Sequence, residues 1–229
     1  MKRSICLLSG GLDSIVSTTM SNQKTKILAA LTFNYHQRAW LQELEAAKKV
    51  SEFLAIPHQV ITLDWMEKIS SSLIYGNHKP PEFSFKTSNP CQTAREVWVP
   101  NRNGVFINIA ASLAEEMEAE IIVVGFNYEE AQTFPDNSLK FVKAINRSLT
   151  YSTLNKIKVV SFTQDMDKKE IVKLGKKIGA PLDLLWSCYY GKQAMCGQCE
   201  SCQRCIRAFK EAGYWETICQ KFSEESIDG

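Results

Sequence analysis

The fold of this chain is decided near its start by one short stretch, Ser9-Gly10-Gly11-Leu12-Asp13-Ser14. An apolar run at residues 3–8 precedes it, and a stretch with helical character follows from about Asp13 to Asn22. A strand, a glycine turn and a helix in this order place the turn at the carboxyl end of a strand. Open α/β sheets bind their ligands at that end.

The residue types in this stretch favour binding of a phosphate. Two glycines let the backbone turn tightly and approach an anion, and the N–H groups that begin a helix attract phosphate oxygens. Ser9 and Ser14 add hydroxyl donors, while Asp13 is suited either to cap the helix or to hold Mg²⁺. A plain glycine turn needs none of these flanking residues. The Gly-Lys-Ser/Thr and Gly-x-Gly-x-x-Gly patterns of other nucleotide sites do not occur here.

The pattern continues outward as alternating strands and helices. Further strands are predicted at residues 27–33, 58–63, 120–125 and 156–161, and further helices at 37–54, 103–117, 138–151 and 168–178. Mostly unbroken apolar strands that alternate with helices predict an α/β fold with a doubly wound parallel sheet. Residues 75–101 hold four of the seven prolines and show no period, so they are predicted to form a long loop with a functional role.

The composition is that of a folded globular protein of modest size. Of the 229 residues, 45% are apolar and 23% are charged, and the net charge is only +2. This charge gives no basic surface for nucleic acid, and no segment is long and apolar enough for a membrane span. The first apolar run is too short for a signal peptide. We therefore expect a cytoplasmic protein with small-molecule substrates and neither nucleic acid nor a membrane as partner; the sequence does not fix the oligomeric state, and a homodimer is one option.

Five of the eight cysteines crowd into residues 188–205, where the strand–helix alternation has ended. In a reducing compartment such a cluster indicates metal rather than disulfides. Steps of three residues on a regular helix each rotate a side chain by about −60°, so a turn at Gly197 is needed for the sulfurs to converge. The predicted zinc ligands are Cys188, Cys196, Cys199 and Cys202. Cys205 is then a small buried residue, and an iron–sulfur cluster is the main alternative to zinc.

These features predict two parts. Residues 1–180 are expected to form an α/β domain with the phosphate-binding turn, and residues 181–229 a small helical appendage with a zinc knuckle. A zinc ion held by four cysteines has no open position, so its predicted role is structural.

The stretch at residues 9–14 resembles the signature of the PP-loop ATP pyrophosphatases, which adenylate an oxygen of their substrate and release pyrophosphate. Nearly the whole chain further resembles one group of them, the 7-cyano-7-deazaguanine synthase (QueC/ExsB) family. Besides residues 9–14 and the cysteine knuckle, the likeness lies in residues 35–38 (Tyr-His-Gln-Arg), 99–103 (Val-Pro-Asn-Arg-Asn), 134–136 (Phe-Pro-Asp), 141–146 (Phe-Val-Lys-Ala-Ile-Asn) and 187–189 (Ser-Cys-Tyr).

The resemblance implies a ligase that forms C–N bonds and uses ATP, Mg²⁺ and Zn²⁺. ATP would adenylate the carboxylate of 7-carboxy-7-deazaguanine, ammonia would give the amide, and a second ATP would convert the amide to the nitrile, a queuosine and archaeosine precursor. Asn101, Ala39 and residues 125–137 depart from the common bacterial pattern and look like the archaeal members. These departures fall where the substrate pocket is expected.

The resemblance also implies roles for single residues. The residues predicted to bind ATP are Leu8, Ser9, Gly10, Gly11, Leu12, Asp13, Ser14, Phe33 and Arg38. Those predicted to bind the acid are Arg102, Asn103, Glu129 and Asp136, and the predicted catalytic residues are Asp13, Ser14 and Arg102. Each has a plainer interpretation: Arg102 and Arg38 as surface charges, Phe33 as a core residue, and the acidic side chains as a solvated loop.

Three other functions compete with the ligase. A PP-loop tRNA sulfurtransferase would use the cysteines for a persulfide or an iron–sulfur cluster, but it would need an RNA-binding surface. A relative that couples the deazaguanine acid to another amine would keep the same fold and the same phosphate-binding turn at residues 9–14, which we call the phosphate loop. A zinc-knuckle binding module without catalysis would have no use for the intact phosphate loop.

Overall fold

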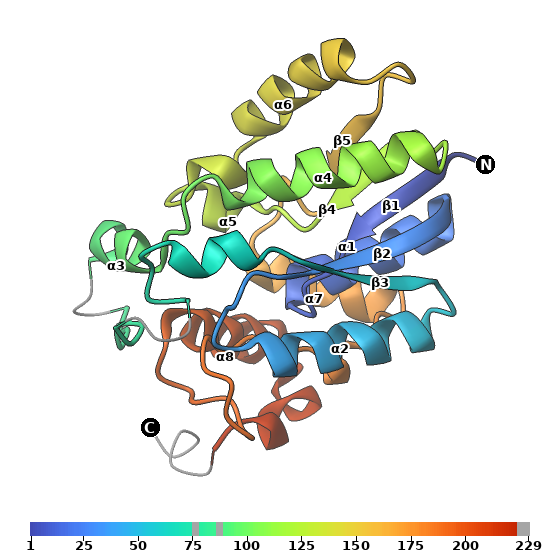
Figure 1. Ribbon diagram of the computed structural model, residues 1–229. Coiled ribbons are helices and arrows are strands. Elements are labelled where there is room, and N and C mark those ends of the chain that lie inside the picture. Colours follow the sequence, from blue (N-terminus) through green and yellow to red (C-terminus); the bar gives the residue numbers. More distant parts are fainter. Residues whose placement is uncertain (75–77, 86–88, 224–229) are drawn as a thin grey trace.

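The computed structural model describes residues 1–74, 78–85 and 89–223. Its centre is a sheet in the order β3-β2-β1-β4-β5, in which every neighbouring pair is parallel (Figure 1). The strands are β1 (Arg3–Leu7), β2 (Lys26–Asn34), β3 (His58–Thr62), β4 (Ile121–Val124) and β5 (Lys158–Ser161). The chain builds outward from β1 to β3 on one side and then crosses to β4 and β5 on the other. The predicted doubly wound α/β fold is therefore confirmed.

Helices cover both faces of the sheet (Figure 1). Their bounds are α1 (Leu12–Lys24), α2 (Trp40–Phe53), α3 (Pro90–Val97), α4 (Arg102–Glu116), α5 (Tyr128–Ala131), α6 (Leu139–Ser152), α7 (Lys168–Lys177) and α8 (Glu200–Ala212). Short 3₁₀ turns are η1 (Asp64–Lys68), η2 (Pro135–Asn137), η3 (Leu182–Leu184), η4 (Trp215–Thr217) and η5 (Cys219–Lys221). Buried residues of α1, α2 and α7 form one core cluster, and those of α4 and α6 form another.

Burial of the strands follows from their place in the sheet. Residues of β1 and β2 lie between the two helical layers, which is why these strands are nearly unbroken apolar runs. Strand β3 is at the edge of the sheet and has exposed positions, with Val60 45% exposed. This explains why its sequence is the least apolar of the five.

The predicted loop at residues 75–101 is wrong in part, because helix α3 occupies residues 90–97. Residues 75–77 and 86–88 of this loop lie outside the described residues. The apolar face of α3 is short: Thr93, Ala94 and Val97 are buried, a spacing of one, three and four residues. Helices tolerate proline in their first turn, so Pro90 begins the helix rather than excluding it. The density of proline and asparagine around it concealed this pattern in the sequence.

The C-terminal segment packs into the body of the protein. Phe209, Ile218 and Phe222 belong to the same core cluster as Leu12 and Ile15 of α1. The predicted division after residue 180 stays a prediction. In the part of the chain that the structure describes, no helix has both the length and the apolar character needed to cross a membrane.

Candidate active site

A cavity of about 260 Å³ opens at the carboxyl ends of the parallel strands. Its walls come from the turn between β1 and α1, the ends of β2 and β4, the beginnings of α4 and α7, and residues 186–189. In a doubly wound sheet this is the crevice where the strand order reverses, since β2 and β4 lie on opposite sides of β1. The position predicted for the phosphate loop is therefore the position of the cavity.

The turn between β1 and α1 is shaped by close packing at Gly10. This residue has a φ of +80°, and a Cβ there would lie 2.8 Å from the Cβ of Ala46 on α2. Its carbonyl accepts a hydrogen bond of 2.9 Å from the backbone N–H of Trp186. Gly10 thus lies behind the turn and fixes it against α2 and the C-terminal segment, while Leu8, Ser9, Gly11, Leu12, Asp13 and Ser14 line the cavity.

Two hydroxyl groups lie at the N-terminus of helix α1. The Ser9 and Ser14 Oγ atoms are 3.1 Å apart, and Ser14 Oγ also donates to the carbonyl of Gly11 at 2.9 Å. Gly11 is the N-cap of α1 and offers no side-chain acceptor to the first N–H groups of the helix. The positive end of α1 and two hydroxyls therefore face the cavity together, as an anion site requires.

Gly125, directly after β4, allows the sheet to pack against this turn. A Cβ at Gly125 would lie 2.6 Å from the backbone N of Ser14. We expect Gly125→Ala to displace the turn, to lower enzymatic turnover about tenfold or more, and to destabilise the fold by about 1–3 kcal/mol. Steady-state kinetics and thermal melting measure the two effects.

Gly179→Ala provides the matched control. Gly179 has a φ of +70°, but a Cβ added there would have no described atom within 4 Å, and the residue does not line the cavity. Its alanine variant should lose stability through backbone strain and keep its turnover. Equal loss of turnover in both variants would contradict the role given to Gly125.

Three charged side chains meet at the phosphate end of the cavity. The Lys168 Nζ atom lies 2.8 Å from Asp13 Oδ2 and 2.7 Å from Glu130 Oε1, and all three residues line the cavity. Lys168 is the first residue of α7, Asp13 lies in the first turn of α1, and Glu130 lies on α5. We call these three residues the charge triad.

Burial and charge pairing together set the pKa values of the triad. Burial raises the pKa of Asp13 to about 6, against the lowering effect of Lys168. Burial alone would lower the pKa of Lys168 and raise that of Glu130. Instead, Asp13 and Glu130 raise the pKa of Lys168, and Lys168 lowers that of Glu130. The second Asp13 oxygen, Oδ1, is buried without a hydrogen-bond partner among the described residues. An unpartnered carboxylate oxygen with a raised pKa is a place where a further cation would be stabilised.

Arg102 lies on another wall of the same cavity. Its Nη1 donates to the Tyr35 hydroxyl at 3.0 Å, and its guanidinium is 5.7 Å from the centre of the Tyr35 ring. Asp136 also lines the cavity, and burial raises its pKa while Arg102 opposes that rise. Asn103 donates to the backbone carbonyl of Asp136 at 3.4 Å. The structure thus brings Arg102, Asn103 and Asp136 together in the wall of the same cavity.

Phe33 lies at the end of β2 and is both a core residue and a cavity residue. Its ring stacks on Phe106 with centroids 4.1 Å apart and planes within 4°, and both residues line the cavity. Only 6% of Phe33 is exposed. Its burial agrees with the interpretation as a core residue. Its place in the cavity wall leaves ATP binding by Phe33 as a prediction.

Two predicted site residues point elsewhere. Arg38 is absent from the cavity wall, because its Nε donates to the carbonyl of Ser72 at 2.7 Å and its Nη2 to that of His78 at 3.0 Å. Glu129 also lies outside the wall, because its carboxylate pairs with Arg204 at 2.8 Å and with Arg207. The carbonyls of a neighbouring loop and the arginines of α8 hold these side chains away from the cavity.

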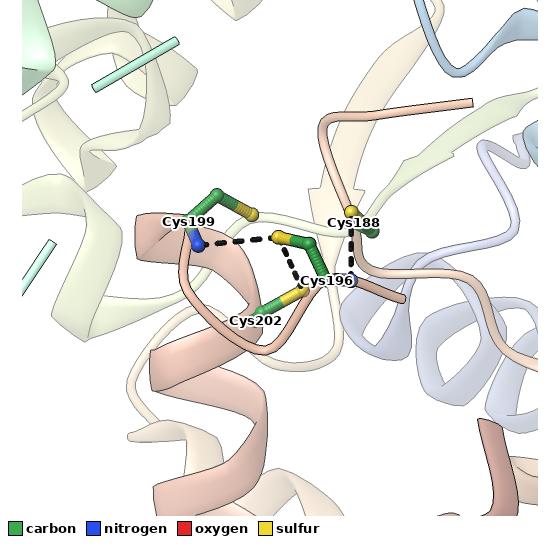
Figure 2. A group of neighbouring side chains, drawn as sticks. All are labelled: Cys188, Cys196, Cys199 and Cys202. Atoms are coloured by element: carbon green, nitrogen blue, oxygen red, sulfur yellow. Dashed lines mark hydrogen bonds between the residues drawn. The ribbon is translucent and has the colours of Figure 1, made fainter. Parts of the chain in front are cut away.

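Four cysteine sulfurs gather beside the beginning of α8. The ligand atoms of Cys188, Cys196, Cys199 and Cys202 all lie within 4.8 Å of one another (Figure 2). Zinc–sulfur bonds of about 2.3 Å in a tetrahedron require sulfurs roughly 3.8 Å apart, and the Cys196 and Cys202 sulfurs are 3.9 Å apart. Gly197, with a φ of +69°, makes the turn between the first two knuckle cysteines.

Backbone N–H groups point at the sulfurs of this cluster. The amides of Tyr190 and Cys196 lie 3.3 and 3.4 Å from the Cys188 sulfur, and the Cys199 amide lies 3.3 Å from the Cys196 sulfur. Such bonds stabilise thiolates, the form that binds metal. Cys205 lies outside the cluster, and burial raises its pKa to about 12. The four sulfurs therefore fit a closed tetrahedral metal site.

Sequence reasoning missed Lys168. It had appeared only as the first residue of a predicted helix, yet the structure makes it the cation at the centre of the triad. One signal was available: Asp167 and Glu170 form a capping box, which places Lys168 at the positive end of α7. A lysine is unfavourable at that end of a helix, so its presence there indicates an anionic partner elsewhere.

A parallel doubly wound sheet, with a turn suited to an anion at the switch point and a charge triad beside it, is the architecture of an α/β nucleotide-binding protein. The comparison with family models agrees, because the model for "Queuosine biosynthesis protein QueC" matches residues 3–213. The chain belongs to the QueC family.

Named relatives extend over nearly the full chain. The 7-cyano-7-deazaguanine synthase of Carboxydothermus hydrogenoformans is 49% identical over 211 residues, which cover 91% of this chain and 98% of the relative. That of Pelotomaculum thermopropionicum is 50% identical, covering 92% and 98% of the two chains. The archaeal enzyme of Methanosarcina barkeri is 45% identical, covering 96% and 98%.

Proposed function

We propose that this protein is an ATP-dependent ligase that converts 7-carboxy-7-deazaguanine and ammonia to 7-cyano-7-deazaguanine. The observation that carries the proposal is that the phosphate loop, the charge triad, Arg102 and Asp136 all line one cavity. The phosphate loop and the charge triad suit a nucleoside triphosphate, and Arg102 with Asp136 suits a planar acid. Relatives of this name at 45–50% identity over nearly the whole chain support the substrate.

The reaction has two activation steps that one cavity can perform in turn. The carboxylate oxygen attacks the α-phosphorus of ATP, pyrophosphate leaves, and ammonia then displaces AMP from the acyl carbon to give the amide. The amide oxygen attacks a second ATP in the same way, and loss of AMP and protons leaves the C≡N bond. Each step places negative charge on phosphate oxygens, and the protein's contribution is to position and stabilise that charge.

The side chains divide this work by their place in the cavity. The N–H groups at the beginning of α1, with the Ser9 and Ser14 hydroxyls, bind phosphate oxygens. Lys168 offers its cationic charge to the departing pyrophosphate. Arg102 keeps its charge, since Tyr35 and Asp136 offset the effect of burial, and its forked donors bind the substrate carboxylate. Asp136 accepts hydrogen bonds from the guanidine-like edge of the deazaguanine.

Magnesium fits the phosphate end of the cavity. Asp13 Oδ1 is buried and has no partner among the described residues, and a hard divalent cation prefers carboxylate oxygens. Asp13 is the residue that would hold Mg²⁺, which would neutralise charge on the leaving pyrophosphate.

Zinc fits the four cysteines, whose sulfur spacing and N–H partners suit a closed Cys₄ site. We propose that the protein acts in the cytoplasm, where such thiols stay reduced, and on small molecules without nucleic acid. A homodimer is one option for the oligomeric state, and a measurement of the mass in solution tests it.

Product analysis tests the substrate. Purified protein with ATP, Mg²⁺, ammonium and 7-carboxy-7-deazaguanine is expected to yield the nitrile, with two AMP released for each nitrile and the amide appearing transiently. Mass spectrometry follows the three species, and a coupled assay counts AMP.

The competing functions predict other results. Formation of the amide alone, or coupling only when an amine other than ammonia is supplied, would overturn the nitrile assignment. A colour from iron and sulfur, with AMP formed only in the presence of tRNA, would favour the sulfurtransferase.

A further inference from the structure

Helix α8 connects the cysteine cluster to the charge triad. Cys202, a member of the cluster, lies near its beginning, and Arg204 follows two residues later. Arg204 is only 8% exposed, so its guanidinium is held inside the protein. Its Nε and Nη2 atoms lie 3.0 and 2.6 Å from Glu200 Oε1, and its Nη1 atom lies 2.8 Å from Glu129 Oε1.

The two glutamates of α5 pair with different cations. Glu129 reaches toward α8 and pairs with Arg204 and Arg207, whereas Glu130 reaches into the cavity and pairs with Lys168. Helix α5 spans only residues Tyr128–Ala131, so Glu129 and Glu130 are neighbours on a single helical turn. Holding Glu129 therefore also fixes where Glu130 presents its carboxylate to Lys168.

The charges of this region depend on one another. Four acidic residues, Asp13, Glu129, Glu130 and Glu200, face the cations Lys168, Arg204 and Arg207. In a largely buried setting each carboxylate is stabilised by a specific cation rather than by water. Of these three cations, Arg204 alone touches both α5 and the acidic residue next to Cys199.

We propose that Arg204 is a positioning residue that ties the cysteine cluster to the charge triad through Glu129. The metal site then supports catalysis as well as the C-terminal fold, because α8 carries both a cluster cysteine and the arginine that fixes α5. This inference rests on the proposed AMP-forming function of the cavity. Glu129 acts here through its neighbours and does not touch the substrate.

Two conservative substitutions interrupt the connection between Arg204 and Glu129. Glu129→Gln removes one carboxylate charge and leaves the Arg204–Glu200 pair intact, so the buried arginine keeps a partner. Arg204→Lys keeps the charge but replaces a forked donor group with a single ammonium, which cannot reproduce its three bonds. We expect each variant to lower kcat for AMP formation about tenfold or more, as loss of such supporting contacts does, with KM for ATP and for the acid nearly unchanged.

Three further measurements isolate the positioning role. The Arg204→Lys/Glu129→Gln double variant should fall no lower than the worse single variant, because both changes interrupt one connection. Zinc content should stay at the parental value. Hydrogen–deuterium exchange should accelerate at residues 128–131 and stay unchanged at residues 196–202. Lys210→Gln, which removes an exposed cation from the same helix, should match the parent throughout.

The outcomes are distinct. A parental kcat in Glu129→Gln, or losses that multiply in the double variant, would overturn the proposal. A raised KM for the acid in Glu129→Gln would instead give that residue a direct substrate contact. If the parental protein forms no AMP with the acid, the proposed function fails, and the exchange measurement alone still decides whether Arg204 fixes α5.

Discussion

Replacing Asp13 with asparagine is expected to lower the rate of AMP formation by about 10²–10³-fold while the fold is kept. The substitution preserves the size of the side chain but removes the negative charge, which pairs with Lys168 and is proposed to hold Mg²⁺ through Oδ1. Lys168 retains Glu130 as a partner, so the buried ammonium is not left alone. The rate of pyrophosphate release under saturating ATP and Mg²⁺ measures the effect.

Asp165→Asn is the matched control for this prediction. Asp165 lies in the same part of the chain as Lys168, but it is exposed and does not line the cavity. Its variant should retain the parental rate and melting temperature. An Asp13→Asn protein that releases pyrophosphate at the parental rate would remove Asp13 from the catalytic residues.

Replacing Cys202 with alanine is expected to release the zinc and to lower the melting temperature by more than about 10 °C. Metal binding at a closed Cys₄ site is coupled to folding of the segment that holds it. For a chain of this length, each kcal/mol of lost stability lowers the melting temperature by roughly 2–4 °C. The affected segment shares its core with α1 and α2, so the loss should reach the nucleotide-binding half as well.

Cys205→Ala separates loss of metal from loss of a buried thiol. Cys205 is on the same helix, equally buried, and outside the cluster. Its variant should keep one zinc per chain by elemental analysis and melt close to the parent. If Cys205→Ala loses zinc while Cys188→Ala retains it, the four-ligand assignment is wrong.

The sequence determined those parts of the molecule in which function depends on residues close together in the chain. The phosphate loop occupies six consecutive positions, and three of the four clustered cysteines fall within seven residues. The strands could be predicted from the sequence because a strand buried between two helical layers must be apolar throughout. Helix α3 was missed because, among residues 92–97, whose burial is described, the buried face consists of three residues.

The tertiary structure alone decided which distant side chains meet. Asp13 and Lys168 are 155 residues apart, and only the packing of α7 beside α1 brings them to 2.8 Å. The same holds for the directions of Arg38 and Glu129, which both follow elements bordering the cavity yet turn away from it. A local pattern gives the place of a residue along the chain. Its side chain goes toward whatever donors, acceptors and charges the rest of the fold places nearby, because a buried polar group needs a partner.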